Sequence, residues 1–146
     1  MEFKKEVQEK IIQKNNKTSD EEFSAILKLV APGTNFRTAI DGALKGQKGA
    51  LIAVENEYLP PLIEGGFKIS TRFTPQRLVE LAKMDGAIVL SKDMKKINYA
   101  NVLLTPDSKI QTQETGTRHK AAERTAKQAG TLVIAISERK HEINLF

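Results

Sequence analysis

Residues 49–54, with the sequence GALIAV, set the fold class of this 146-residue chain. They form a short apolar run bounded by turn residues, which is the pattern of a buried strand. Two similar runs follow, GAIVLS at 86–91 and TLVIAIS at 131–137. Because helical patterns lie between these runs, we expect an α/β fold in which helices flank both faces of one central twisted sheet.

Three helices are predicted before the first of these strands. Ser19, with Glu22 three residues later, matches a capping box that begins the second helix. After the first strand, a polar loop that contains Pro and Gly is expected from Glu55 to Gly66. The apolar positions of the three helices are Phe3, Val7 and Ile11; Phe23, Ile26, Leu27 and Val30; and Phe36, Ile40 and Leu44.

Two more helices are predicted later in the chain. Thr74 is placed as an N-cap with Pro75 at the first helical position, where the missing N–H costs nothing. Thr117 is placed as the N-cap of the last helix, which Gly130 ends at the C′ position.

Two hairpins decide how the strands run. The polar segment KDMKK connects the run at 86–91 to an apolar strand at 97–104, and EINLF at 142–146 pairs back onto the run at 131–137. These hairpins predict a mixed rather than an all-parallel sheet.

Composition predicts one soluble, cytoplasmic domain. The chain has 40% apolar and 28% charged residues and no cysteine, and no apolar run approaches the ~20 residues that span a bilayer. The N-terminus alternates Lys and Glu with single apolar residues, unlike a signal peptide. We expect 1–18 to be a helical extension and 19–146 the main domain, and we expect the chain to have been excised from a longer protein.

The net charge of +5 favours anionic partners, namely nucleotides, nucleic acid or acidic lipid. Aromatic residues make up only 5% of the chain and Trp is absent, so a stacking platform for single-stranded nucleic acid is poorly supported. Charge alone does not choose the partner.

The segment ETGTRHKAAER, residues 114–124, places cations at the wrong end of a helix. Arg118, His119 and Lys120 fall in the first turn, although the helix dipole disfavours each cation there by roughly 0.3–1 kcal/mol. A glycine-containing loop and the free N–H groups of a helix N-terminus bind phosphate, so a multiply charged anion would offset this cost. Alternatively, these side chains extend into solvent, where a misplaced charge costs little.

The segment Asp85-Gly86-Ala87 lies where a helix leads into a buried strand. A carboxylate at this place can hold Mg²⁺ or Mn²⁺ beside a phosphate, and glycine lets a ligand approach the backbone closely. Alternatively, Asp85 and Gly86 form a plain helix-to-strand turn.

Other polar residues are weaker candidates. His119 and His141 are the two histidines of the chain, too few for a multi-His metal site, so we expect His119 to orient or bind rather than to act as a general base. Gly65-Gly66 reads as a tight turn or a close-approach loop. Asn98 and Asn101 either bind a base or form hydrogen bonds within a hairpin.

Together these motifs resemble the diadenylate cyclase (DAC) domain. MDGAIVLS, YAN, TPD, ETGTRHKAAER, AKQAG and IAISER occur in the order and spacing of that domain. The resemblance is closest to the N-terminal domain of the DNA integrity scanning protein DisA and its archaeal relatives, and it runs from about Leu27 to the chain end. DGA alone is a weak motif, but DGA followed by the RH-basic motif within ETGTRHKAAER is specific.

The resemblance implies that two ATP molecules condense into cyclic di-AMP and release two pyrophosphates. Each domain holds one nucleotide, and two domains self-associate with their active sites face to face, an assembly that can extend to a higher oligomer. Mg²⁺ or Mn²⁺ assists. No membrane partner is implied, and no nucleic acid for this domain alone, because DisA-type proteins bind DNA through a separate C-terminal region.

The resemblance also implies residue roles. Asp85 matches the catalytic aspartate that positions the ribose 3′-oxygen and the metal. Leu104 contacts adenine by its main chain and Ser137 by its hydroxyl. The residues expected to bind the nucleotide are Gly86, Ala87, Leu104, Thr117, Arg118, His119, Lys120 and Ser137.

Two positions depart from the family pattern. The usual motif is Arg-His-Arg, but here the third residue is Lys120, which keeps the charge and lacks the planar fork of arginine. Ala121 stands where close relatives often carry Thr. These departures motivate an alternative function, a non-catalytic module that binds ATP or cyclic di-AMP, and the net charge motivates a third, nucleic-acid binding.

Overall fold

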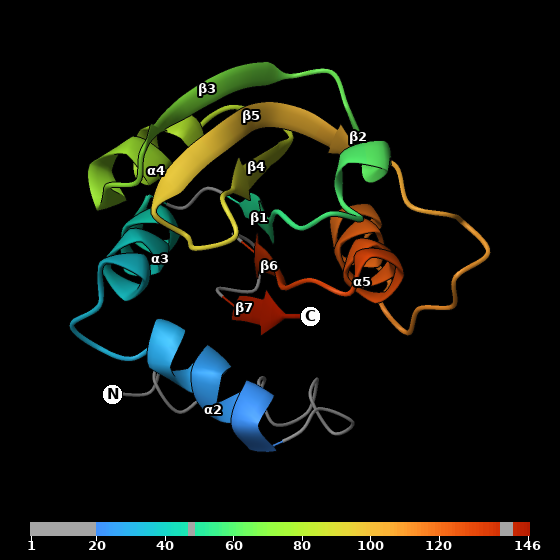
Figure 1. Ribbon diagram of the computed structural model, residues 1–146, viewed down its shortest axis with the longest axis horizontal. Helices are drawn as coiled ribbons and strands as arrows, with labels where there is room; N and C mark the ends of the chain where they lie inside the picture. The colour runs from blue at the N-terminus through green and yellow to red at the C-terminus, as the bar shows by residue number, and fades with distance from the viewer. Residues whose placement is uncertain (1–19, 47–48, 138–141) are drawn as a thin grey trace.

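The structure, a computed structural model, describes residues 20–46, 49–137 and 142–146, and a seven-stranded sheet lies at its centre (Figure 1). The strand order is β2-β5-β4-β1-β6-β7, and β3 also pairs with β5. β1 and β4 run parallel and the other pairs antiparallel, so the predicted mixed sheet is confirmed. The strands are β1 Ala50–Val54, β2 Ile63–Glu64, β3 Phe67–Arg72, β4 Ala87–Leu90, β5 Lys96–Leu104, β6 Val133–Ser137 and β7 Glu142–Leu145.

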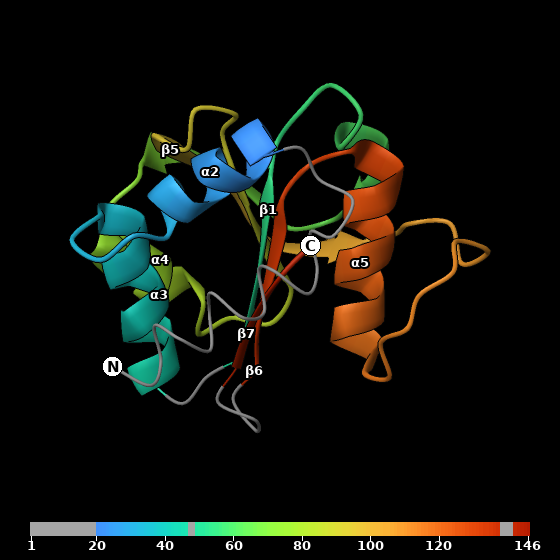
Figure 2. The same ribbon diagram turned by 90° about the horizontal axis from the view of Figure 1, so that it is seen from below.

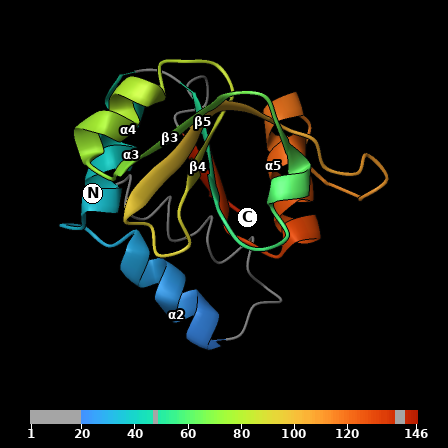
Figure 3. The same ribbon diagram turned by 45° about the horizontal axis from the view of Figure 1, so that its top comes forward.

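Helices cover both faces of this sheet. Figure 2 shows α2, α3 and α4 on one side and α5 on the other, and Figure 3 shows the strands between α3 and α5 from a third direction. The helices are α2 Asp20–Leu29, α3 Asn35–Lys45, the 3₁₀ helix η1 Pro60–Leu62, α4 Pro75–Leu81 and α5 Thr117–Ala129. Within the described residues, no helix is both long enough and apolar enough to span a bilayer.

Alternate residues of each central strand pack against opposite helix layers. In β6, Ile134 and Ile136 join the core beneath α3 and α4, whereas Val133 and Ala135 join the core beneath α5. All four side chains are fully buried. Burial on both faces explains why the predicted strands are apolar at nearly every position.

Of the three predicted helix-end signals that fall on described residues, two hold and one is wrong. Thr74 caps α4, its hydroxyl accepting from the N–H of Arg77 at 3.2 Å, and Gly130 ends α5 in the left-handed conformation. Thr117, however, is the first residue of α5, and Gly116 is the N-cap. Since glycine has no side-chain oxygen, the start of α5 lacks a side-chain cap.

The segment expected to be a loop is more ordered than predicted. It contains η1 and the short strand β2, and the following strand β3 was not predicted at all. β3 lies at the outside of the sheet, where Phe67, Lys68, Ser70 and Arg72 are exposed, so it lacks an apolar pattern. The helix expected within 1–18 and the capping residue Ser19 lie outside the described residues.

Side chains of α5 hold the long connection that precedes it. Glu123 accepts from the Thr112 hydroxyl at 2.6 Å. The guanidinium of Arg124 donates to the carbonyl of Ile110 at 2.8 Å. The chain therefore enters α5 along a path that the helix itself stabilises.

Close packing shapes the entry to β4. Gly86 has a φ of +89°, and a Cβ placed on it would lie 2.8 Å from the carbonyl oxygen of Val102. The facing residue of β5, Asn101, has a φ of +55° and lies where the β4–β5 register shifts. On the other side of Asn101, a Cβ on Gly66 would lie 2.6 Å from the carbonyl oxygen of Ala100. Glycine is therefore required at both positions by the β5 backbone.

Replacing Thr125 by valine should stabilise the domain. The Thr125 hydroxyl on α5 is buried and has no hydrogen-bond partner among the described residues. Burying an unpaired hydroxyl is unfavourable, so Thr125→Val should raise the free energy of unfolding by about 1 kcal/mol. Urea denaturation measures this change, with Thr38→Val on the exposed face of α3 as the control. A loss of stability in Thr125→Val would contradict the conclusion that the Thr125 hydroxyl has no hydrogen-bond partner.

Alanine at Gly86 should cost more than alanine at Gly33. Both glycines have a φ of +89°, but a Cβ on Gly33 would meet no atom within 4 Å. Gly33→Ala therefore measures the backbone strain alone, about 1–2 kcal/mol. Gly86→Ala adds overlap with the β5 backbone and should cost about 1–3 kcal/mol more. Equal losses in thermal or urea unfolding would show that β5 yields to the added methyl group.

Candidate functional site

Predicted site residues lie at one end of the central strands. We call this end the β1/β4 edge because β1 and β4 both begin there; the name refers to the ends of the strands and not to an outermost strand of the sheet. Asp85 and Gly86 come directly before Ala87, the first residue of β4. β5 runs antiparallel to β4 with Val102 opposite Ala87, so Leu104 extends past the start of β4 to the level of Asp85. The carboxylate of Asp85 is therefore exposed at the same end of the sheet as the last residue of β5.

β6 and α5 reach the same edge. Ala50 lies opposite Ile136, so Ser137, the last residue of β6, is level with Gly49 just before β1. Gly49 is also where Arg118 lies: a Cβ placed on Gly49 would overlap the guanidinium. The sheet register and this contact thus place Ser137 and the first turn of α5 at the β1/β4 edge.

The first turn of α5 has the properties of an anion site. The N–H of Lys120 donates to the Gly116 carbonyl at 2.8 Å, and the N–H groups of Thr117 and Arg118 before it have no acceptor within the helix. No acidic residue lies in this turn. Neither Arg118 nor Lys120 forms an ion pair within the part of the chain that the structure describes. Backbone donors, the helix dipole and two cations thus coincide.

His119 is held by the last strand. Its Nε2 lies 3.0 Å from the side-chain amide nitrogen of Asn144 on β7. Its ring meets the ring of Phe146 edge to face, with centroids 6.4 Å apart. Unlike exposed Arg118, His119 is half-buried. β7 and the residue that follows it therefore restrain the orientation of this imidazole.

The neighbours of Asp85 differ in what they can offer to a ligand. Ala87 and Leu104 are buried beneath α5, so they can contact a ligand mainly through their backbone. Among the described residues, no group of three or more His, Asp or Glu side chains could hold a metal. Mg²⁺ commonly binds one or two carboxylates together with substrate phosphates, and the exposed Asp85 fits that mode.

Other candidate residues have structural partners. The amide of Asn98 donates to the Glu55 carboxylate at 2.6 Å, a contact to the loop after β1 rather than within its own hairpin. Gly65 is a plain turn residue with a φ of +69° and no near neighbour, whereas Gly66 is a close-approach residue. His141 lies outside the described residues.

Two residues of this region were not predicted. The sequence predicts Gly49 only as the first residue of the apolar run at 49–54, and no local pattern reveals that Arg118 lies against it. Asn144 lies in the segment EINLF, where a polar residue between buried Ile143 and Leu145 is the one available signal. Alternation in a strand places that residue on the face opposite to its neighbours, toward α5.

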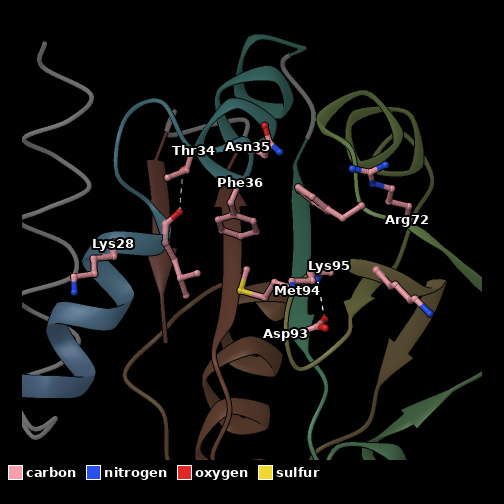
Figure 4. A pocket seen from close by; sticks show the side chains of 11 residues that line it. Lys28, Thr34, Asn35, Phe36, Arg72, Asp93, Met94 and Lys95 are labelled. Atoms are coloured by element: carbon pink, nitrogen blue, oxygen red, sulfur yellow. Dashed lines mark hydrogen bonds between the residues drawn. The ribbon is translucent and has the colours of Figure 1, made fainter.

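A hollow of about 640 Å³ lies away from the β1/β4 edge, between α2, α3 and the β4–β5 turn (Figure 4). It contains none of the predicted site residues. Figure 4 shows Phe36 and Met94 inside it, whereas the charged ends of Lys28 and Arg72 extend outward. Near this hollow, hydrogen bonds from the Ser91 hydroxyl and the Lys95 backbone N–H lower the pKa of the Asp93 carboxyl.

Solved structures share this fold. The chain matches a hypothetical membrane spanning protein from Bacillus cereus with a TM-score of 0.66 and 29% identity, over 76% of this chain and 57% of that one. It also matches DacA from Staphylococcus aureus with a TM-score of 0.57 and 24% identity, over 75% of this chain and 78% of that one.

Sequence comparisons identify the family. The DNA integrity scanning protein DisA of Acetivibrio thermocellus is 49% identical over 132 residues, which cover 90% of this chain and 37% of that protein. The chain thus spans a little over a third of the length of such relatives. The family model DAC, described as DisA bacterial checkpoint controller nucleotide-binding, matches residues 37–146. The family predicted from the motifs is confirmed: this chain belongs to the DAC family.

Proposed function

We propose that the domain is a diadenylate cyclase, a nucleotidyltransferase that condenses two ATP molecules into 3′,5′-linked cyclic di-AMP and releases two pyrophosphates. The observation that carries this proposal is the meeting of the Asp85 carboxylate and the cationic first turn of α5 at the β1/β4 edge. Membership in a nucleotide-binding family supports the same class of ligand. Because ATP is a cytoplasmic metabolite, we place the activity in the cytoplasm.

The first turn of α5 binds the triphosphate in this proposal. The N–H groups of Thr117 and Arg118 donate to phosphate oxygens, and Arg118 and Lys120 neutralise their charge. The same anion removes the repulsion between these cations and the helix dipole. The ligand thus completes a helix start that lacks both a side-chain cap and an acidic residue.

The adenine end of the nucleotide lies along the strand ends. Leu104 offers backbone groups and Ser137 a hydroxyl, both at the β1/β4 edge. Gly86 and Ala87 form the backbone next to Asp85, on which the sugar can rest. The nucleotide therefore spans from β5 and β6 to the start of α5.

Asp85 orients the ribose 3′-hydroxyl. It would also hold Mg²⁺ or Mn²⁺ together with phosphate oxygens, and a bound ion supplies neutralisation of the charge on the phosphates. In each half of the reaction, the 3′-oxygen of one ATP bonds to the α-phosphorus of the other. The bond from that phosphorus to the oxygen that bridges it to the β-phosphate breaks, pyrophosphate leaves, and the proton of the 3′-hydroxyl passes to solvent water. Such a displacement depends mainly on positioning and charge neutralisation.

Two domains meet face to face in this scheme, since each holds only one of the two nucleotides. The site is open at the end of the sheet, where Asp85 is exposed. The large apolar side chains of Met84 and Leu103, beside the edge, are exposed as well. These features suit an edge that a second copy covers, alone or within a higher oligomer.

The alternative is a module that binds ATP or cyclic di-AMP without turnover. Lys120 favours it, because an ammonium group positions a phosphate less tightly than the fork of an arginine. The two functions share a binding site and differ only in product formation.

Asp85→Asn should abolish synthesis while ATP binding is largely retained. The substitution keeps the shape of the side chain but removes the charge that holds the ion, a loss of several kcal/mol or roughly 100-fold or more in rate. Mass spectrometry of the products formed from ATP with Mn²⁺ or Mg²⁺ measures the rate, and calorimetry measures binding. Asp41→Asn on α3 is the control for loss of one charge. Undiminished synthesis in Asp85→Asn would refute the role of Asp85, and ATP binding without any product in the unaltered chain would favour the binding module.

Lys120→Arg should tighten ATP binding. A planar guanidinium can form two parallel hydrogen bonds to phosphate, which we expect to be worth about 1 kcal/mol, or roughly fivefold in affinity. Calorimetry with ATP measures the change. Lys127→Arg, near the other end of α5, is the matched control and should leave the affinity unchanged. Unchanged affinity in Lys120→Arg would show that this side chain does not reach the phosphates.

A further inference from the structure

We infer that Gly49 is a positioning residue that holds the guanidinium of Arg118 at the β1/β4 edge, an inference that rests on the proposed function. Gly49 comes directly before β1, and the guanidinium takes the place that a side chain at position 49 would occupy. Glycine at this position thus decides where one cation of the proposed phosphate site lies. Neither the DGA nor the RH-basic motif contains Gly49.

The alternation of side chains along β1 directs position 49 toward α5. Leu51 and Ala53 join the core beneath α5, whereas Ala50 and Ile52 join the core on the other face of the sheet. Since successive side chains of a strand point to opposite faces, a side chain at position 49 would follow Leu51 and Ala53 toward the helix. At Gly49 this row of side chains ends, and it leaves space beneath the first turn of α5.

The guanidinium of Arg118 fills this space. A Cβ on Gly49 would overlap Nη1 of Arg118, and it would lie 2.9 Å from Cζ and 3.3 Å from Nη2. Arg118 is exposed, and its side chain forms no ion pair with any residue that the structure describes. Packing against the Gly49 backbone therefore restrains an exposed cation while its N–H donors stay accessible to a ligand.

The backbone of Gly49 does not itself require glycine. Gly49 is not one of the glycines with a positive φ, which among the described residues are Gly33, Gly65, Gly66, Gly86 and Gly130. Alanine can therefore adopt the conformation of this position. The atoms that its Cβ would meet belong to the end of a flexible side chain, which can move aside. Gly49→Ala should thus displace the cation and leave the fold intact.

Gly49→Ala should weaken ATP binding without weakening the fold. Moving a guanidinium away from the phosphates loses charge-assisted hydrogen bonds, so the dissociation constant of ATP should rise roughly three- to tenfold. The melting temperature should stay the same or rise, because alanine restricts the unfolded chain more than glycine does. Calorimetry and thermal unfolding of the full 146-residue chain measure the two quantities. Unchanged affinity in Gly49→Ala would overturn the inference.

Gly46→Ala is the matched control for the effect of alanine on the backbone. Gly46 ends α3 with a φ of −68°, and a Cβ on it would lie 3.5 Å from its nearest neighbours, the carbonyl oxygens of Ala43 and Gly42. This substitution should leave the affinity for ATP unchanged. An equal loss of affinity in Gly46→Ala would show that Gly49 has no special role and would overturn the inference.

A double-mutant cycle shows whether Gly49 acts through Arg118. In an Arg118→Ala background, Gly49→Ala should have no further effect on the dissociation constant of ATP, because the side chain that it displaces is gone. Additive losses of affinity would mean that Gly49 affects the ligand by another route, and they would overturn the inference.

The restraint on Arg118 can also be measured without a ligand. Nitrogen-15 relaxation of the arginine Nε–H groups reports how ordered each guanidinium is, and an Arg118→Lys variant assigns the signal of Arg118 by removing it. We expect this group to be more ordered than that of Arg72, an exposed arginine whose charged end extends outward (Figure 4). Gly49→Ala should lower the order of Arg118. Equal order of Arg118 and Arg72 in the unaltered chain would overturn the inference, even if Gly49→Ala does not fold.

These measurements separate the inference from the proposed function. If the unaltered chain does not bind ATP, the proposed function fails, and the relaxation of the Arg118 Nε–H group still decides whether Gly49 restrains this side chain. If the chain forms cyclic di-AMP but the double-mutant cycle is additive, the proposed function stands and the role of Gly49 is refuted.

Discussion

The close contact between α5 and the sheet is the constraint on which the site depends. Alanines form much of this contact on both sides, with Ala122 and Ala129 on the helix facing Ala53, Ala87 and Ala135 on the strands. Helices approach their neighbours more closely when the side chains between them are small. A short separation brings the first turn of α5 to the ends of β1 and β6, where Arg118 lies against Gly49. Larger side chains in this layer would lift the cations away from Asp85.

The rest of the site follows from strand direction. Parallel pairing makes β1 and β4 begin at one edge, and antiparallel pairing makes β5 and β6 end there. One end of the sheet thus collects a carboxylate, a hydroxyl, free backbone groups and a helix start, all from separate parts of the sequence. Such convergence of polar groups at strand ends is typical of ligand sites in α/β proteins.

Strands that are buried on both faces were predictable from the sequence because nearly all of their residues are apolar. Exposed strands were not, because they lack an apolar pattern. The runs in β1, β4 and β6 were predictable because both of their faces are covered, whereas exposed β3 carries no such signal. The N-cap of α5 was misplaced by one residue because glycine and threonine are both acceptable N-caps, and only backbone geometry distinguishes them. The motifs that carry the family resemblance were found because they are contiguous. Asn144 was not predicted because its contact is with His119 on α5, 25 positions earlier in the chain, and no local pattern indicates that contact.

The strand order also determines when the site can exist during folding. β1 is central, and its partners β4 and β6 lie far from it in sequence, with all three separated by helices. These long-range pairings must form before Asp85, Ser137 and Arg118 become neighbours. A ligand bound across these strand ends therefore stabilises the sheet as a whole, and its binding free energy adds to the cooperative unfolding free energy of the domain.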